Sequence, residues 1–352
     1  MKDIKTMKNI AFVCNHLFGG GAERVLVSLA NYYAEMGYNV HIIVFDGKKR
    51  YYTVPSVMIS EIGDTASLLT QSLAIRRELK RIQPEVIIAF EYFVNLAVII
   101  ASIGIKAKII VSERNDPSRV GSGLGKDQLR NFLYRYCDVL VCQTPDAKKY
   151  FPQYVQKHTV IIPNPVKENL PEPWKGERIH EVVNFCRMND QKNLKLLIDA
   201  FKDFHFDFPD YELVLFGDGP EKEPLKQYVQ DNGMSDFVQL KSNASDVHEQ
   251  VVDSAMFVSS SDYEGLSNSM LEALAIGLPT ICTDCPCGGA RMMIRDGENG
   301  ILVPVGDRSA LTEAMKRVAD NKRLSEKLSI QGAKLRNELS IDKIAQRWEE
   351  LF

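Results

Sequence analysis

The sequence has no clear membrane-spanning segment and no visible signal peptide. The first apolar run, Ile10 to Cys14, is short and leads into a glycine loop. Residues 86–105 approach the length of a membrane span, but Glu91 and Asn95 interrupt them. A buried strand followed by a buried helix explains this segment better. The sequence therefore predicts a chain that does not cross a membrane.

The sequence also lacks the pattern of a disulfide scaffold or of a metal site. It has seven cysteines, an odd and scattered number, which is typical of reduced thiols in the cytosol. Cys282, Cys285 and Cys287 lie close together, but no fourth thiol or histidine is near them in the sequence. No Asp-x-Asp motif stands where it would hold a metal for a diphosphate, and Thr283-Asp284-Cys285 is not that motif. We therefore expect no metal and no cofactor.

The low net charge of −3 conceals an asymmetry between the two halves of the chain. Residues 1–170 carry 22 Lys+Arg against 15 Asp+Glu, whereas residues 171–352 carry 21 against 31. A chain of 352 residues is also too long for one ordinary core. The sequence thus predicts two units that face different partners, and we expect no nucleic acid among those partners.

Short apolar runs alternate with longer helical stretches in both halves, which indicates an α/β fold with parallel sheets covered by helices. In the first half, strands are expected at Ile10–Cys14, Val86–Phe90 and Val139–Cys142. In the second half, a strand at Val182–Cys186 precedes a helix at Leu194–Phe204. Each half is therefore predicted to be a Rossmann-like domain.

Prolines mark the boundary between these domains. Pro163 and Pro165 keep the backbone extended where the chain leaves the first half, and a polar linker follows them. We predict domains at residues 1–168 and 169–338. The tail, residues 339–352, has apolar side chains at helical spacing and is expected to pack as a helix.

A glycine loop, Gly19-Gly20-Gly21, follows the first predicted strand and opens a helix. Glycines at such a place let a backbone approach a ligand, although a plain tight turn explains them equally well. The dinucleotide fingerprint Gly-x-Gly-x-x-Gly is absent. His16 lies just before the loop and is a polar candidate, but a lone histidine is more often structural.

Two cations occupy a loop between a strand and a helix in the second half. Arg187 offers a forked set of donors and Lys192 a point charge, a combination that suits a diphosphate. The alternative is an ordinary pair of surface cations. Gly217 lies at the end of a later strand. It either lets a nucleotide come close to the backbone or forms a simple turn.

Glu264 and Glu272 flank the expected start of a helix near Ser267. Free N–H groups at a helix start attract phosphate, and carboxylates accept hydrogen bonds from sugar hydroxyls. This arrangement suits a sugar joined to a nucleotide. Two alternatives remain: solvated carboxylates, or a capping box in which Ser269 and Glu272 satisfy the helix start.

The stretch from Glu264 to Pro279, EGLSNSMLEALAIGLP, resembles the signature of retaining glycosyltransferases of family 4. Gly-Gly-Ala-Glu-Arg at residues 20–24 is similar to the motif of a bacterial branch that builds polysaccharides and lipid-linked glycans. Asp-Gly-Glu-Asn-Gly-Ile-Leu-Val-Pro, at residues 296–304, also resembles a family element. The resemblance implies the GT-B fold, in which two Rossmann-like domains face each other across a cleft. It implies that the first domain binds the acceptor, that the second binds the nucleotide sugar, and that the helix at residues 339–352 crosses back onto the first domain.

The resemblance also implies roles for particular residues. It assigns catalysis to Glu264, which touches the donor sugar, and to Arg187 and Lys192, which hold the donor diphosphate. The other donor-binding residues that it implies are Glu272, Gly20, Gly21, Gly217, Leu266, Ser267 and Asn268. Contacts with the acceptor or the donor sugar are expected from His16, Glu113, Arg114, Gly288 and Gly289.

Two departures from the family pattern leave the choice of donor open. Arg114 stands where many relatives have a histidine that touches the donor sugar, and Met292 stands where many have a glutamate. These departures motivate an alternative, a non-catalytic partner that binds the nucleotide sugar and activates another transferase. A GT-B epimerase that acts on the nucleotide sugar itself is the second alternative.

The function that we predict is transfer of a hexosyl or N-acetylhexosaminyl unit, with retention, from a UDP-linked sugar to a glycan on a polyprenyl diphosphate. The basic residues of the first half predict contact with the inner face of a cytoplasmic membrane or with a lipid-linked diphosphate. They lie at residues 48–50, beside Tyr51 and Tyr52, and at residues 76–81. A solvated basic face is the alternative.

Overall fold

A computed structural model describes residues 8–18, 20–50, 53–63, 67–119, 123 and 125–352, with only the backbone of residues 47–50. The chain divides into two compact units. Unit 1 comprises residues 1–165 and 341–352, and unit 2 comprises residues 166–340. The units are described separately below.

The sheet of unit 1 has seven parallel strands within the described residues, in the order β3-β2-β1-β4-β5-β6-β7. The strands are β1 (Asn9–Leu17), β2 (Asn39–Arg50), β3 (Met58–Glu61), β4 (Val86–Phe90), β5 (Lys108–Ser112), β6 (Val139–Cys142) and β7 (Thr159–Ile161). All five residues of β4 are buried, because helices cover both faces of a parallel sheet. The chain reverses direction across the sheet between β1 and β4, which makes their carboxyl ends the place where such folds bind ligands.

Helices follow most of these strands. They are α1 (Gly21–Glu35), α2 (Leu68–Ile82), α3 (Tyr92–Ala101), α4 (Lys126–Tyr134), α5 (Pro145–Tyr150) and α6 (Gln153–Gln156). Ser67 and Thr70 form a capping box that starts α2. Thr144 caps α5 and accepts a hydrogen bond from the backbone N–H of Ala147.

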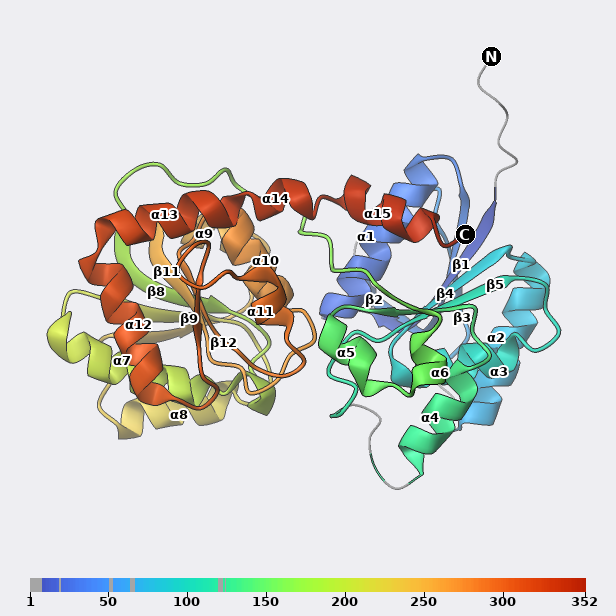
Figure 1. Cartoon of the computed structure of the whole chain (residues 1–352), viewed down its shortest axis with the longest axis horizontal. Helices are drawn as coiled ribbons and strands as arrows, with labels where there is room; N and C mark the ends of the chain where they lie inside the picture. The colour runs from blue at the N-terminus through green and yellow to red at the C-terminus, as the bar shows by residue number, and fades with distance from the viewer. Residues whose placement is uncertain (1–7, 19, 51–52, 64–66, 120–122, 124) are drawn as a thin grey trace, which may run out of the picture. The chain divides into compact units, whose positions relative to one another are not determined.

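The end of the chain belongs to unit 1, although it follows unit 2 in the sequence. Helix α15 (Ile341–Glu349) lies beside α1 (Figure 1). Trp348 is fully buried, with its ring 5.6 Å from that of Phe90. Tyr33 donates a hydrogen bond of 2.7 Å to the carbonyl oxygen of Ala345. The core of unit 1 therefore includes the last residues of the chain.

The sheet of unit 2 has six parallel strands in the order β10-β9-β8-β11-β12-β13. The strands are β8 (Ile179–Phe185), β9 (Glu212–Phe216), β10 (Val238–Lys241), β11 (Ser254–Ser259), β12 (Thr280–Thr283) and β13 (Ile301–Val303). Here the direction of the chain across the sheet reverses between β8 and β11. The predicted α/β class with parallel sheets is confirmed in both units.

A short 3-10 turn (Asp190–Lys192) and several helices connect the strands of unit 2. The helices are α7 (Leu194–Asp207), α8 (Lys222–Asp231), α9 (Val247–Val251), α10 (Asn268–Ala275), α11 (Gly289–Met293), α12 (Arg308–Asp320), α13 (Lys322–Ala333) and α14 (Leu335–Glu338). Helices α7 and α12 pack together (Figure 1). Phe201 of α7 is fully buried in one core with Val182 and Leu215 of the sheet. This core holds the strand ends in place.

Candidate active site

The predicted cations and the first predicted glutamate of unit 2 follow two neighbouring strands. Arg187 and Lys192 lie in the segment after β8, and Glu264 lies in the loop after β11. Strands β8 and β11 pair in parallel, so both segments leave the carboxyl edge of the sheet at the point where its strand order reverses. This is the edge at which open α/β sheets bind ligands.

Lys192 and Glu264 form an ion pair at this edge. The Nζ atom of Lys192 donates to Oε1 of Glu264, and both side chains are about 15% exposed. Gln191 donates a hydrogen bond of 3.0 Å to the other carboxylate oxygen, and Ser261 donates one of 3.1 Å to Oε1. The side chains of Lys192, Gln191 and Ser261 therefore hold the carboxylate of Glu264 in place.

Further hydrogen bonds join the two loops that carry this pair. The hydroxyl of Ser260 lies 2.9 Å from the carbonyl oxygen of Lys192 and 3.0 Å from that of Asn193. Asn193 donates a hydrogen bond of 2.8 Å to Asp262. These contacts fix the positions of the backbone on both sides, so the ion pair sits on a rigid support.

The charges of this pair alter the titration of their neighbours. Burial acts to lower the pKa of Lys192, but the charge and hydrogen bond of Glu264, together with the nearby Cys186 and Cys285, outweigh it, so the pKa is raised and the amine stays cationic. Burial raises the pKa of Cys186 to about 11 and that of Cys285 to about 12. Both thiols are therefore protonated near neutral pH, which excludes them as thiolate nucleophiles.

Glu272 lies in the second turn of α10, the helix that follows the Glu264 loop. The N-cap of α10 is Ser267, whose hydroxyl accepts a hydrogen bond of 3.4 Å from the N–H of Met270. The carboxylate of Glu272 instead lies 2.9 Å from Nε2 of His248, and both residues are buried. The capping-box alternative built on Ser269 and Glu272 is thus wrong, because the N-cap is Ser267 and Ser269 lies within the helix.

His248 is a residue that the sequence did not single out. It lies in α9, and its ring meets that of Phe185, at the end of β8, edge to face at 5.3 Å. The Nδ1 atom of His248 is buried and has no hydrogen-bond partner among the described residues. His248 thus connects Glu272 to the end of the strand that leads into Arg187.

Arg187 itself is exposed, and no ion pair holds its guanidinium within the described part of the chain. Gly217 packs against the backbone of Cys186, the residue before Arg187. A Cβ atom at Gly217 would be 1.9 Å from the carbonyl oxygen of Cys186, and its φ of +155° favours glycine. Gly217 therefore lets the two backbones approach closely just before Arg187, and its contact with a donor stays a prediction.

The glycine pair Gly288-Gly289 packs against the loop that holds Glu264. A Cβ atom at Gly289 would lie 2.1 Å from the carbonyl oxygen of Gly265, and Leu266 beside it is buried. Glu264 also exchanges backbone hydrogen bonds of 2.7 and 2.8 Å with Pro286 and Cys287. The space beside Gly289 is thus taken by the protein's own backbone, and the pair positions the loop after β11.

In unit 1, His16 and Gly20 of the glycine loop both lie next to the carboxylate of Glu23. Nδ1 of His16, at the end of β1, lies 3.2 Å from Oε1 of Glu23. The Glu23 side chain is 4% exposed and folds back over the start of α1, where a Cβ atom at Gly20 would lie 1.7 Å from its Oε2. Gly20 therefore leaves room for this carboxylate, and Gly21 begins the helix. Gly19 lies outside the described residues.

Glu91 is a second residue that the sequence does not single out, because there it only interrupts an apolar run. It directly follows β4 and has a φ of +80°, which is rare for a residue with a side chain. Burial, and then the charge and hydrogen bond of Glu23, raise the pKa of Glu91 to about 8. At neutral pH Glu91 thus holds a proton, which it shares in a hydrogen bond with Glu23.

Glu113 and Arg114, directly after β5, lie in different surroundings. Glu113 is 2% exposed and accepts a hydrogen bond of 2.5 Å from Tyr134, so the structure does not support its direct contact with a ligand. Arg114 is only partly buried, with its guanidinium 4.5 Å from the ring centre of Phe90. Of these two candidates, Arg114 is the one with enough exposed surface to contact a ligand.

Two basic residues of α2 have partners within unit 1. Arg76 donates hydrogen bonds of 2.7 and 2.6 Å to the carbonyl oxygens of Ala101 and Ile103. Arg81 pairs with Glu78 at 2.7 Å. The side chains of residues 48–52 lie outside the described residues, so the prediction for that stretch stays open.

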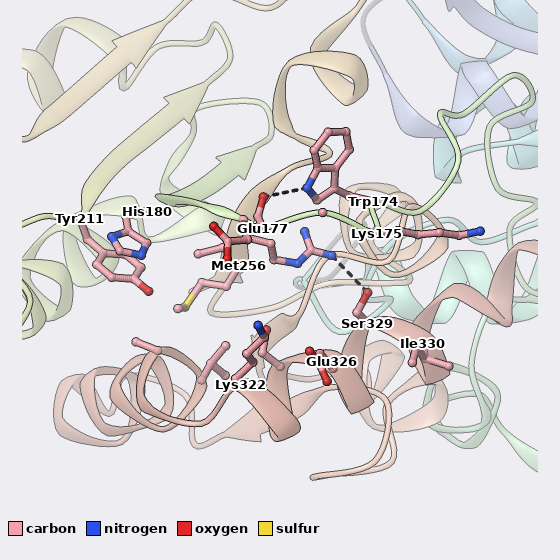
Figure 2. Close-up of a pocket in the computed structure, with 16 residues that line it drawn as sticks. Trp174, Lys175, Glu177, His180, Tyr211, Met256, Lys322, Glu326, Ser329 and Ile330 are labelled. Carbon is pink, nitrogen blue, oxygen red and sulfur yellow. Dashed lines mark hydrogen bonds between the residues drawn. The ribbon is translucent and has the colours of Figure 1, made fainter.

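Figure 2 shows a groove on unit 2 at the opposite edge of its sheet, beside the residues that begin β8 and β11. The ring of His180 stacks on that of Tyr211 at 4.4 Å, and Trp174 donates a hydrogen bond of 2.9 Å to the carbonyl oxygen of Glu177. None of the predicted site residues lines this groove. The candidate active site is therefore a different part of unit 2.

Two absences among the described residues concern metals and membranes. No group of three or more His, Cys, Asp or Glu side chains there is arranged to hold a metal ion. No helix in the same part of the chain is both long and apolar enough to cross a bilayer.

Comparisons with known families match both units of the chain. Residues 172–335 match the model of "Glycosyl transferases group 1", and residues 19–170 match that of "Glycosyltransferase Family 4". Together the two models cover most of the chain. Arg187, Lys192, Glu264 and Glu272 all fall within the first of these matches.

A relative in Campylobacter jejuni is 26% identical over 98% of each chain. Its name is GalNAc-α-(1→4)-GalNAc-α-(1→3)-diNAcBac-PP-undecaprenol α-1,4-N-acetyl-D-galactosaminyltransferase. Among solved structures, Anabaena HepE in complex with UDP has a TM-score of 0.83 at 17% identity, over 97% of this chain and 98% of its own. The same protein with UDP-glucose gives a TM-score of 0.83 at 16% identity over the same shares of the chains. The expected GT-B fold is confirmed by this likeness.

Proposed function

The chain belongs to the family 4, or group 1, glycosyltransferases, and on that premise we propose that it transfers a hexosyl or N-acetylhexosaminyl unit from a UDP-linked sugar. The anomeric configuration is retained. The observation that carries this proposal is the pairing of Lys192 with Glu264 at the carboxyl edge of the unit 2 sheet, where the strand order reverses. The complexes of HepE with UDP and UDP-glucose support the choice of donor.

In this proposal Lys192 and Arg187 bind the diphosphate of the donor. Lys192 remains cationic because Glu264 raises its pKa, and Arg187 is exposed and can turn towards a ligand. Negative charge grows on the diphosphate as the bond to the sugar breaks, so fixed cations stabilise the transition state more than the ground state. These two side chains take the place that a metal ion has in other transferases, and no metal is required.

Glu264 and Glu272 have separate tasks. Glu264 accepts hydrogen bonds from the hydroxyls of the sugar when Lys192 turns to the phosphate. Glu272 binds the ribose hydroxyls from the start of α10, where the N–H groups of Ser267 and Asn268 add positive potential. No carboxylate is assigned as a nucleophile, and a leaving phosphate oxygen accepts the proton of the acceptor hydroxyl.

We further propose that the acceptor is a glycan on a polyprenyl diphosphate and that it binds on unit 1. The name of the Campylobacter relative contains such an acceptor. Helix α2 exposes Leu69 and Leu73, which are 68% and 66% exposed, on the same face as Arg77 and Lys80. Exposed apolar and basic side chains on one face suit an anionic membrane surface, so the protein is peripheral to the inner face of the cytoplasmic membrane.

The test is incubation of the purified chain with a panel of UDP- and GDP-sugars, with and without a polyprenyl-diphosphate-linked saccharide. We expect nucleotide release that depends on the acceptor, and a product whose new linkage keeps the anomeric configuration of the donor by NMR. Conversion of the donor without any acceptor would instead indicate an epimerase. Donor binding without release, across the whole panel, would indicate a non-catalytic partner.

A further inference from the structure

The groove of Figure 2 lies at the amino edge of the sheet in unit 2, beside the starts of β8 and β11. Its volume is about 820 Å³, within the range of pockets that bind small ligands. Helix α13 forms one side, and the segment before β8 forms another. The cations and glutamates of the candidate active site follow the carboxyl ends of the same strands. The groove is therefore a separate candidate site with its own lining.

Trp174 presents an indole ring at this groove. The residue is 43% exposed. Its Nε1 donates a hydrogen bond of 2.9 Å to the carbonyl oxygen of Glu177, and a Cβ atom at Gly176 would lie 3.0 Å from that Nε1. The indole is thus held by the backbone of its own segment, and its only polar atom already has a partner. A fixed and partly exposed indole is typical of a surface that binds a ligand.

A second aromatic surface lies toward the other end of the groove (Figure 2). The ring of His180 stacks on that of Tyr211 at 4.4 Å, with only 4° between the two planes. Asp210 pairs with Nδ1 of His180, so the orientation of the imidazole is fixed twice. Tyr211 is buried, whereas the His180 side chain is 53% exposed. The groove thus offers an aromatic ring toward each end, which suits an extended ligand.

The exposed charges of the groove balance one another. Lys175 and Lys322 are opposed by Glu177 and Glu326. None of these four side chains makes an ion pair or a hydrogen bond within the described part of the chain. Lys322 and Glu326 are four residues apart in α13, so they lie on the same face of that helix. Donors and acceptors are therefore both available to a ligand.

Arg178 also lines the groove, but the protein itself occupies its guanidinium. Its Nη1 donates to the carbonyl oxygens of Val252 and Ser254 at 3.1 and 2.8 Å. Its Nη2 donates to the carbonyl oxygen of Gly277 at 2.7 Å and to the hydroxyl of Ser329 at 3.1 Å. Burial lowers its pKa to about 10, so it remains a cation at neutral pH. Arg178 thus fixes the walls of the groove and does not offer a free fork to a phosphate.

These features select an uncharged ligand that carries hydroxyl groups. A ligand with many charges of one sign would be repelled by half of the exposed charges around it. An apolar partner would bury those charges without partners, which is costly. A saccharide has apolar C–H faces that pack on aromatic rings, and its hydroxyls accept from ammonium groups and donate to carboxylates. Each feature of the groove therefore has its counterpart in an oligosaccharide.

We propose that this groove binds a neutral oligosaccharide, with Trp174 and His180 as stacking surfaces and with Lys322 and Glu326 as hydrogen-bonding partners. The site is non-catalytic and distinct from that of Lys192. The proposal rests on the proposed function only for the source of the saccharide, which is the glycan that the active site extends. A glycan held in the groove has a raised local concentration at the protein.

The experiment titrates the full chain with neutral tetrasaccharides of glucose, galactose, N-acetylglucosamine and N-acetylgalactosamine. The chain has two tryptophans, and Trp348 is fully buried, so quenching of fluorescence by acrylamide reports on Trp174. We expect at least one of these saccharides to shield Trp174 from acrylamide. A sulfated tetrasaccharide, used at the same concentrations, should give no shielding.

Substitutions test whether the saccharide lies in the groove. Trp174→Ala removes a stacking surface and should weaken binding about tenfold or more, as measured by calorimetry. Glu326→Gln keeps the shape and loses the charge, and should weaken binding by roughly threefold to fivefold. Phe206→Ala is the control, because Phe206 is an aromatic residue of unit 2 that is 87% exposed and does not line the groove. Trp174→Phe keeps a ring, covers the case in which Trp174→Ala does not fold, and should bind with intermediate affinity.

Four results would overturn the proposal. The first is that no saccharide of the panel shields Trp174. The second is that the variants at Trp174 and Glu326 bind as tightly as Phe206→Ala, since the saccharide then lies elsewhere. The third is that the sulfated probe binds more tightly than the neutral ones. The fourth is a dimer of the wild type that Trp174→Ala dissociates, without any binding of saccharide, because a second copy of the chain would then occupy the groove.

The titrations contain no nucleotide sugar, so they decide on the groove independently of catalysis. Absence of sugar transfer with every donor would refute the proposed function and leave a measured saccharide site intact. Transfer without any shielding of Trp174 would refute the groove and leave the proposed function intact.

Discussion

The carboxyl edges of the two sheets hold their charges in opposite ways. In unit 2, Lys192 and Glu264 pair with each other, so each charge has its counter-ion within the protein. In unit 1, like charges are brought together: Glu23 hydrogen-bonds to Glu91, and Arg24 lies close to Arg114. Both edges lie where the strand order favours ligand binding, so the difference is one of chemistry and not of fold.

This difference shows how each edge keeps its charged groups stable. Opposite charges stabilise each other in unit 2, and the pKa of Lys192 rises. In unit 1, burial and then a neighbouring like charge raise the pKa of Glu91 to about 8 and lower that of Arg114 to about 9. We conclude that opposite charges compensate each other within unit 2, whereas unit 1 keeps like charges together at its edge.

The largest effect is expected from breaking the ion pair of unit 2. Lys192→Gln removes the charge that stabilises the leaving diphosphate, so the turnover number should fall on the order of a thousandfold. Lys195→Gln is the matched control, because Lys195 is an exposed lysine three residues away that lies over the ring of Tyr228. Steady-state rates of nucleotide release measure both. A Lys192→Gln enzyme as active as the control would show that the pair has no catalytic role.

A second experiment separates the stability of the two units. Trp348→Ala empties a fully buried position in unit 1 and should lower its free energy of unfolding by roughly 3 to 4 kcal/mol. The chain has two tryptophans, so Trp174 of unit 2 then remains as the only indole fluorophore. Urea titrations should show an earlier transition by circular dichroism and an unchanged transition of Trp174 fluorescence. An equal shift by both probes would show that the units unfold as one.

The carboxylate pair of unit 1 predicts a dependence of stability on pH. The pKa of Glu91 is about 8 in the folded chain against 4.5 as its ordinary value, so the folded state holds a proton that the unfolded state releases between these values. Stability should therefore fall as the pH rises from 5 to 8. Glu91→Gln removes this penalty and should stabilise the protein by roughly 1 to 2 kcal/mol at pH 8, with little gain at pH 5.

The control for this substitution is Glu85→Gln, which changes an exposed carboxylate just before β4. Melting temperatures across the same pH range measure both variants. A pH slope in Glu91→Gln as steep as in the wild type would mean that Glu23 and Glu91 do not share a proton.

The smallest effect is expected at the histidine behind Glu272. His248→Phe removes the hydrogen bond of 2.9 Å that orients the carboxylate, and should weaken UDP binding about tenfold without lowering the turnover number at saturation. His248→Gln, which can still donate, should recover part of the affinity. His205→Phe is the control, since His205 is a partly buried histidine of α7 that stacks on Phe237. Equal affinities in all three variants would make His248 a packing residue only.

The sequence predicted the fold well because its signals are local. The apolar runs Val86–Phe90 and Val139–Cys142 coincide with β4 and β6, and the glycines, prolines and caps between such runs mark where elements start. The loop of Arg187 and Lys192 between a strand and a helix, and the helix start near Ser267, also followed from local pattern. These features depend on residues that are neighbours in the sequence, so they can be predicted from one sequence.

The side chains that contact the site residues could not be predicted from local sequence patterns. Glu23 and Glu91 meet only because β1 and β4 are neighbours in the sheet, and nothing near Glu91 distinguishes it from a residue that merely interrupts an apolar run. His248 reaches Glu272 from another helix. A positive φ and a shared proton depend on the packing of the whole unit, and so they appear only in the structure.

The most direct measurement is a crystal structure of the chain with UDP. The account predicts that the phosphate oxygens lie within hydrogen-bond distance of Lys192 and Arg187, that the ribose lies against Glu272, and that Glu264 no longer pairs with Lys192. A diphosphate bound elsewhere on unit 2, for example in the groove beside Trp174 and Tyr211, with the ion pair intact, would contradict it.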